Sequence, residues 1–303
     1  MGFSAACTGR SGLASREVRE CTACISLFHH DLSSAPFVPP LAPRPHWSTI
    51  SVAGHACEIY EPAEPQPGRA VLYLHGVDER ALVDSPGLRD AIEAAALPTI
   101  APRTGRSWWL DRIMPGFDKA FTPERFVVEQ VRAEIEGRFG VKPPGIALLG
   151  TGMGGQGALR IAYRHPTLFP VSAAIAPSID FHLAMRECDE RTDGDYYDTL
   201  WETYGDVERA RQDTAILHVH PLNWPRHHWF ASDPSDPYWH DGATRLQSKL
   251  RALGITHTAL LDSRGPATEP TPVDHRCGFE NRVAADAIRF LADSLDQESR
   301  RLV

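Results

Sequence analysis

Short apolar runs alternate with longer segments of helical periodicity from residue 70 onward. Ala70–Leu74 (AVLYL) and Gly145–Leu149 (GIALL) are almost wholly apolar, which is typical of strands buried on both faces. Gly87–Ala96 and Pro123–Phe139 space their apolar residues as helices do, with Thr122 as the expected cap of the second. Because strands that alternate with helices form right-handed βαβ units, this order predicts a mostly parallel sheet covered by helices.

The same alternation continues to the C-terminus. Further strands are expected over Pro98–Ala101, Val171–Ala176, Arg226–Ser232 and Thr256–Leu261, and further helices over Gly155–His165, Tyr238–Leu253 and Asn281–Leu295. Upstream, His46–Val52 and Ala56–Tyr60 flank a glycine turn and predict a β-hairpin. Residues 180–225 interrupt the alternation and predict a small helical insertion over the carboxyl ends of the strands. Residues 1–45 end in a proline-rich run and predict a partly disordered leader or extended arm, outside a folded domain of residues 46–303.

Charge and composition exclude several classes of function. The 303 residues carry 31 basic and 39 acidic side chains, and the resulting net charge of −8 provides no general attraction for nucleic acids or anionic membranes. The N-terminus has no signal-peptide pattern and no apolar run is long enough to span a membrane, so we expect a cytoplasmic protein. The six cysteines are scattered and predict thiols, and the 14 histidines lack acidic partners at metal-ligand spacing, so no metal site is expected.

A glycine-rich turn over residues 150–157 joins the expected strand Gly145–Leu149 to a helix, and two templates fit it. The first is the dinucleotide fingerprint G-x-G-x-x-G, formed by Gly150, Gly152 and Gly155, with Asp180 as the ribose-binding acid. A lone match is weak, and at least two βα units precede the turn, whereas a dinucleotide fold normally uses its first. Dinucleotide binding therefore stays an alternative.

The second template is the nucleophile elbow G-x-S-x-G. The run Gly150-Thr-Gly152-Met-Gly154 fits this template everywhere except at its centre, where the serine is replaced by Gly152. The elbow needs small residues on both sides of the nucleophile because the helix packs closely on the strand there. Gly152 therefore occupies the nucleophile position without supplying a nucleophile.

The residues around this turn resemble one family of α/β-hydrolases. The run GTGMGGQGAL, followed by Ala162–Pro166 and Ala173–Pro177, is similar to the putative esterase family of S-formylglutathione hydrolase (esterase D), feruloyl esterases and mycolyltransferases, whose usual form is G-x-S-M-G-G. The similarity spans roughly residues 50–298. It implies an α/β-hydrolase fold with an eight-stranded, mostly parallel sheet, no cofactor, a small-molecule ester, acyl or glycosyl ligand, and often a homodimer.

The resemblance also places an oxyanion site. His75-Gly76 ends the first buried strand, where the family begins its oxyanion loop, and the backbone N–H groups of Val77 and Met153 are the expected donors. Trp108 and Trp109 follow the second buried strand, in a loop expected at the carboxyl edge of the sheet. They are candidates for the wall of a ligand pocket, the alternative being a place in the core. His75 and Gly76 are expected to line the same pocket.

The remaining catalytic positions follow the order nucleophile, acid, base. Asp236 is the expected acid, with Asp233 as a close rival, and both follow the strand that ends near Ala231. The resemblance assigns His275 as the base, in a loop before the last helix. The acid and base are thus present while the nucleophile is missing.

Three explanations of Gly152 remain open. In the first, the chain is a natural pseudoenzyme that binds its ligand with little or no turnover. In the second, water that is activated by His275 and Asp236 attacks the ester directly. In the third, the serine was removed by mutagenesis. The first is the leading interpretation: an esterase-family protein with a degenerate nucleophile elbow, and at most a very weak carboxylic-ester hydrolase.

Overall fold

The computed structural model describes residues 46–114, 116–187, 197–236, 239–262 and 272–301. The described residues all belong to the compact unit Arg44–Val303. The predicted leader of residues 1–45 lies outside the described residues.

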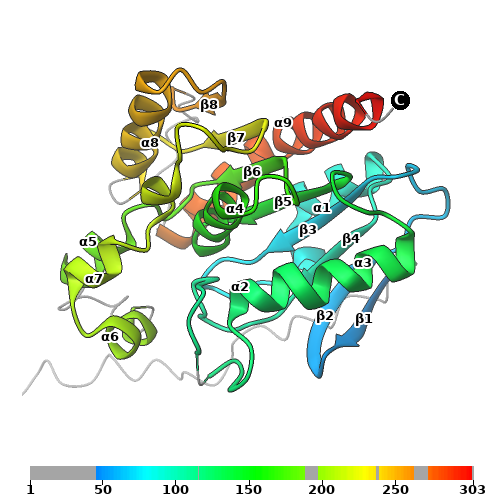
Figure 1. Ribbon diagram of the computed structural model, residues 1–303. Coiled ribbons are helices and arrows are strands. Elements are labelled where there is room, and N and C mark those ends of the chain that lie inside the picture. The colour runs from blue at the N-terminus through cyan, green and yellow to red at the C-terminus, as the bar shows by residue number, and fades with distance from the viewer. Residues whose placement is uncertain (1–45, 115, 188–196, 237–238, 263–271, 302–303) are drawn as a thin grey trace, which may run out of the picture. The chain divides into compact units, whose positions relative to one another are not determined.

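An eight-stranded sheet forms the centre of this unit (Figure 1). Its strands are β1 (Trp47–Val52), β2 (His55–Tyr60), β3 (Ala70–Leu74), β4 (Thr99–Pro102), β5 (Ile146–Thr151), β6 (Val171–Ile175), β7 (His227–Ala231) and β8 (Thr258–Leu260). Their order is β1-β2-β4-β3-β5-β6-β7-β8. β2 runs antiparallel to both β1 and β4, and all other neighbours are parallel. The predicted mostly parallel sheet is confirmed.

The hairpin at the edge of the sheet is also confirmed, with a tighter turn than expected. Val52 pairs with His55, so the turn consists of Ala53 and Gly54 alone. Both have positive φ, 47° and 89°. Two central residues with positive φ match the twist of the flanking strands, which is why this turn type predominates in two-residue hairpins.

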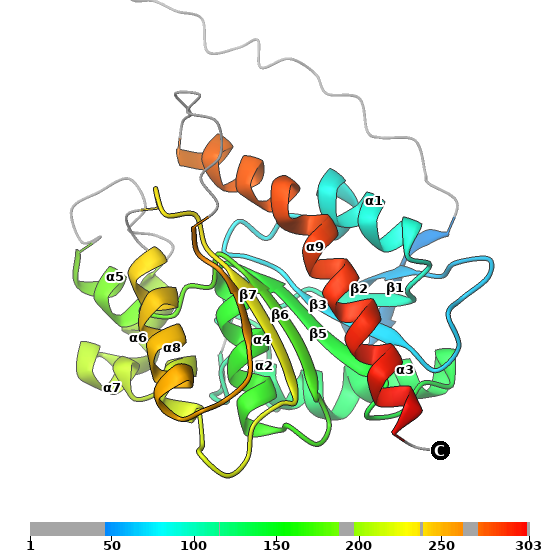
Figure 2. The same ribbon diagram turned by 90° about the horizontal axis from the view of Figure 1, so that it is seen from above.

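Helices cover both faces of the sheet (Figure 2). On one face lie α1 (Pro86–Ala94) and α9 (Pro272–Arg300); on the other lie α2 (Pro123–Arg125), a π-helical continuation (Phe126–Val131), α3 (Arg132–Phe139), α4 (Met153–Arg164) and α8 (His240–Ala252). The insertion consists of α5 (Phe181–Glu187), α6 (Asp198–Tyr204) and α7 (Val207–Arg211), followed by a short 3-10 turn (Ala215–His218), and another such turn (Leu82–Asp84) precedes α1. The helical insertion within 180–225 is thus confirmed for its described residues.

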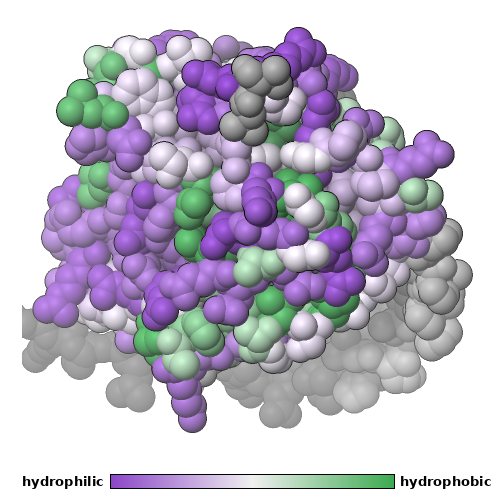
Figure 3. Space-filling model, turned by 45° about the vertical axis from the view of Figure 1, so that its right-hand side comes forward, coloured by the Kyte–Doolittle hydropathy of each residue, from purple (hydrophilic) through white to green (hydrophobic). Residues whose placement is uncertain are grey.

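The sequence accounts for the layers. β3 and β6 are buried along their whole length, as continuous apolar runs require, and each face of the sheet has its own apolar cluster. Thr122 caps α2 as predicted, because its Oγ1 accepts a hydrogen bond from the Arg125 N–H at 3.1 Å. On the face in Figure 3 hydrophilic residues predominate, with hydrophobic ones scattered among them. No helix in the described ranges has the length and apolar character to cross a membrane.

The last helix differs from its prediction. α9 begins at Pro272 rather than near Asn281, so the backbone of His275 lies in the first turn of the helix instead of a loop. Proline suits the first helical position, since its missing N–H is not needed there. The buried side chains of Phe279 and Val283 stabilise this half of the helix against the sheet, despite Gly278. Sequence periodicity alone did not reveal that packing against the sheet extends the helix to Pro272.

Candidate active site

The turn between β5 and α4 has the backbone of a nucleophile elbow. Gly152 has φ 54° and ψ −115°, which costs about 1–3 kcal/mol for a residue with a Cβ but little for glycine. Its N–H donates to the Ile175 carbonyl at 2.9 Å, and its carbonyl accepts from the Ser178 N–H at 3.0 Å. A Cβ built on Gly152 would lie 3.9 Å from the Ser178 Oγ and 4.0 Å from the Gly76 Cα. A Cβ would therefore fit at this corner among the described residues, at the cost of backbone strain.

The neighbouring glycines are explained by close packing of α4. A Cβ on Gly154 would lie 1.9 Å from the Leu74 carbonyl oxygen, and one on Gly150 would lie 2.1 Å from the Gly154 carbonyl oxygen. A Cβ on Gly157 would lie 2.5 Å from the Trp109 Cβ. Gly150 and Gly154 are glycine because the backbones of α4 and the strands are in direct contact, as the elbow template requires, whereas Gly157 makes room for the side chain of Trp109.

The dinucleotide alternative loses its support in this geometry. The first glycine of the fingerprint, Gly150, faces protein backbone rather than an open surface, and the turn follows β5 in the middle of the sheet. The proposed ribose ligand Asp180 is buried and forms an ion pair with Arg245 of α8. Packing thus accounts for the glycine spacing, and Asp180 already has a cationic partner.

His75 fixes the loop that follows β3. The ring is buried, its Nδ1–H donates to the Gly76 carbonyl at 2.8 Å, and its Nε2 accepts from the Thr104 N–H at 3.3 Å. Burial lowers the pKa of His75, which favours the neutral ring that this pair of hydrogen bonds needs. His75 therefore connects two loops at the carboxyl edge of the sheet, and its predicted contact with ligand stays a prediction.

The two expected oxyanion donors lie on the segments that meet at this corner. Val77 follows Gly76, whose Cα lies next to the position of a Cβ on Gly152, and Met153 is the first residue of α4. Backbone N–H groups at the start of a helix favour negative charge. The arrangement is compatible with an oxyanion site, and the role of both amides stays a prediction.

Trp108 and Trp109 are in the core, which was the alternative to a pocket wall. Both are fully buried with positive φ, 53° and 55°. The Trp109 indole N–H donates to the His75 carbonyl at 3.2 Å, and the Trp108 ring packs against Phe181 of the insertion. With no exposed surface, neither side chain forms a pocket wall in this structure.

A cavity of about 680 Å³ lies beside this loop and is lined by the residues that flank the tryptophans. Hydroxyl and charged groups predominate in it, including those of Thr104, Ser107, Arg112, Thr199 and Glu202. The sequence could not decide between wall and core for the two tryptophans, because bulky aromatics are typical of both. That this loop binds a ligand stays a prediction.

The two candidate acids follow β7 and have different contacts. Asp233 is buried, and its carboxylate accepts from the Ser235 N–H at 2.9 Å and from Arg282 of α9 at 2.7 Å. Asp236 is partly exposed, and its Oδ1 accepts from the Trp239 N–H at 3.2 Å, at the start of α8. Asp233 thus joins this loop to the helix that carries His275. The His275 side chain lies outside the described residues, so the acid–base pair stays a prediction.

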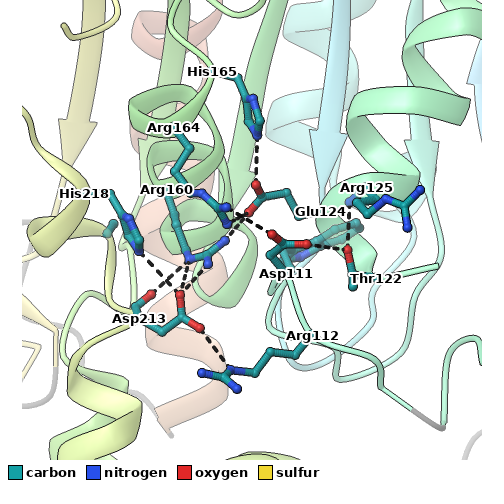
Figure 4. Close-up of polar contacts among 12 residues, drawn as sticks. Asp111, Arg112, Thr122, Glu124, Arg125, Arg160, Arg164, His165, Asp213 and His218 are labelled. Carbon is teal, nitrogen blue, oxygen red and sulfur yellow. Dashed lines mark hydrogen bonds and ion pairs between the residues drawn. The ribbon is translucent and has the colours of Figure 1, made fainter. Parts of the chain in front are cut away.

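A buried ion cluster anchors the insertion to the elbow helix (Figure 4). Arg160 of α4 is 2% exposed and contacts the carboxylates of Glu124, in α2, and Asp213, which follows α7. Asp213 also accepts from the Tyr204 hydroxyl at 2.7 Å and from Arg112 at 3.3 Å. Sequence analysis missed this cluster. The available signal was an arginine on the apolar face of the helix that begins at the elbow.

His228 has a hydrogen-bonding role in the core. His228 is buried, with its Nδ1 3.1 Å from the Tyr163 hydroxyl and its Nε2–H donating to the Thr256 carbonyl at 2.8 Å. Burial lowers the pKa of His228 to about 4. Within the described ranges, no group of three or more His, Cys, Asp or Glu side chains is arranged to hold a metal ion.

Solved structures with this fold include several esterases. The chain is similar to an S-formylglutathione hydrolase from Agrobacterium tumefaciens, with 18% identity, a TM-score of 0.58, and coverage of 80% of this chain and 90% of that one. It is similar to FphF, a fluorophosphonate-binding serine hydrolase of Staphylococcus aureus, with 12% identity, a TM-score of 0.61, and coverage of 78% and 92%. A ferulic acid esterase shows 14% identity, a TM-score of 0.59, and coverage of 82% and 97%.

These likenesses establish the fold. No curated protein matches the sequence. The family model described as Putative esterase matches residues 58–260, a span that begins in β2, contains the elbow and ends in β8. Because this match covers more than half of the chain, the protein belongs to the Putative esterase family of α/β-hydrolases.

Proposed function

We propose that this esterase-type protein binds an ester, acyl or glycosyl ligand at the carboxyl edge of its sheet and hydrolyses carboxylic esters very weakly or not at all. The observation that carries the proposal is Gly152, which has the elbow backbone and room for a Cβ but no hydroxyl. The elbow backbone supports the proposal that this corner still binds ligand although the nucleophile is missing.

The loss of the serine has a large expected effect on rate. Removing the nucleophile of a serine triad lowers kcat by about 10⁶-fold, and binding with an oxyanion site leaves about 10³–10⁴-fold over water. The neighbouring hydroxyl of Thr151 does not replace it, because that Oγ1 lies 3.0 Å from the hydroxyl of the buried Tyr73. Met153, on the other side, is no nucleophile.

The test restores the hydroxyl. Gly152→Ser is expected to raise hydrolysis of p-nitrophenyl butyrate by at least 10³-fold over the wild type. Gly152→Ala is the matched control, because it adds the same Cβ and backbone strain without a hydroxyl, and it should gain nothing. Adding His275→Ala to the serine variant should abolish the gain. A folded Gly152→Ser protein with unchanged activity would contradict the proposal.

Direct attack by water is the second candidate, favoured by the space over Gly152. Among the described residues other than its chain neighbours, no heavy atom lies closer than 3.9 Å to the position of a Cβ there. Polar groups that line such a space can hold a water molecule, which His275 and Asp236 would activate. This mechanism predicts slow hydrolysis by the wild type that His275→Ala removes. A wild type without measurable hydrolysis would exclude it.

A further inference from the structure

The hydroxyl of Ser178 lies beside Gly152, the elbow position at which the nucleophile hydroxyl is missing. Ser178 follows the end of β6 and is 2% exposed. Its N–H donates to the Gly152 carbonyl at 3.0 Å, so its backbone is tied to the elbow itself. Among the described residues other than the chain neighbours of Gly152, its Oγ is the atom nearest to the position that a Cβ on Gly152 would occupy, at 3.9 Å. The side chain therefore points toward the space where the nucleophile of an active esterase would stand.

This hydroxyl forms no hydrogen bond with another residue in the described part of the chain. A hydroxyl without such a partner is able to donate to a bound ligand. Ser178 lies beside the N-terminus of α4, a helix of 12 residues whose first N–H groups are directed toward the same corner. The Ser178 hydroxyl and the first N–H groups of α4 are thus both able to donate hydrogen bonds at this corner.

Such a set of donors favours a negatively charged oxygen. The N-terminus of α4 carries partial positive charge, and hydrogen bonds to charged acceptors are roughly twice as strong as those to neutral ones. The Asp78 carboxylate opposes such binding, since its Oδ1 would lie 3.0 Å from a Cβ on Gly76. Asp78 is more than half exposed and pairs with Arg80, so solvent and the guanidinium weaken its repulsion.

We propose that Ser178 is a ligand-binding residue of this site, and that it makes the site selective for a free carboxylate over the corresponding ester. One carboxylate oxygen accepts from the Ser178 hydroxyl, and the other lies over Gly152 toward the start of α4. The ligand class is then a carboxylic acid, the product of ester hydrolysis. This inference rests on the proposed function, since it requires that the elbow corner binds ligand.

The test compares sodium butyrate with ethyl butyrate in ligand-observed NMR titrations. The wild type is expected to bind butyrate at least tenfold more tightly than its ester. Ser178→Ala should weaken butyrate binding by about tenfold or more, because a hydrogen bond to a charged group is lost, and should change ethyl butyrate binding less than twofold. Ser178→Cys keeps the shape with a weaker donor, so it should also weaken butyrate binding.

Ser172→Ala is the matched control. Ser172 is a fully buried serine on β6 that pairs with Leu148, at the far end of the strand from the elbow, and its replacement should leave both affinities unchanged. Equal butyrate affinity in the wild type and in Ser178→Ala, or a wild type that prefers the ester, overturns the inference. If Gly152→Ser gains hydrolysis while the wild type does not bind butyrate, the inference fails and the proposed function stands. If the wild type does not bind butyrate and Gly152→Ser gains no hydrolysis, both fail.

Discussion

Gly154→Ala is expected to destabilise the protein although it replaces a helical glycine by the best helix former. The new Cβ would lie 1.9 Å from the Leu74 carbonyl oxygen and 2.6 Å from that of His75, where real contacts are not shorter than 3.0 Å. α4 and β3 must then separate by 3.0 − 1.9 = 1.1 Å, because neither backbone atom can rotate away. Such overpacking costs about 3 kcal/mol, and the gain in helix propensity offsets about 1 kcal/mol. The expected net loss is about 2 kcal/mol.

Urea unfolding followed by circular dichroism measures this loss. Gly137→Ala is the control, because Gly137 lies inside α3 and a Cβ there would meet no atom within 4 Å among the described residues outside its own helix. That replacement should stabilise the protein by up to about 1 kcal/mol. The two substitutions are chemically identical and are expected to have opposite signs. A Gly154→Ala protein as stable as the wild type would refute the close approach of α4 to β3, and with it the packing explanation of the elbow glycines.

Two further predictions concern the buried ion cluster. Arg160→Met should lower the free energy of unfolding by about 3 kcal/mol in urea titrations, because it leaves the buried carboxylates of Glu124 and Asp213 without their shared cation; an unchanged midpoint would contradict this. Burial alone would raise the pKa of Asp213, but contacts with His218, Arg160 and Tyr204 outweigh it and hold that pKa well below its usual range. The resulting stability is present above about pH 4 and is lost as the pH falls toward the folded pKa. The stability difference between the wild type and Asp213→Asn should therefore shrink between pH 5 and pH 3, and a constant difference would show that Asp213 is not the group responsible.

Local sequence patterns were sufficient for the sheet and the elbow. The continuous apolar run of β3 predicts a strand covered on both faces, and the structure places it in the centre of the sheet. The elbow was predictable because the glycine at position 154 is imposed by a backbone contact, so its spacing from Gly150 is visible in the sequence. These features depend on residues close together in the chain.

Features that depend on tertiary contacts were not predictable. The start of α9 at Pro272 depends on packing against α1 and the sheet, and the burial of Trp108 depends on where the insertion lies. Ser178 carries no motif of its own and becomes a candidate only because β5 and β6 are neighbours in the sheet. Arg160 likewise gains its role from Asp213, which is 53 residues away in the chain.

Covalent labelling tests the central claim, that residue 152 occupies the place of a catalytic nucleophile, most directly. The wild type and the Gly152→Ser variant are treated with a fluorophosphonate, which reacts with activated serines, and the modified residue is identified by mass spectrometry. We expect no adduct on the wild type and one adduct at position 152 of the variant, lost when His275→Ala is added. An unlabelled but folded Gly152→Ser protein, or an adduct at another residue in the wild type, would contradict the account.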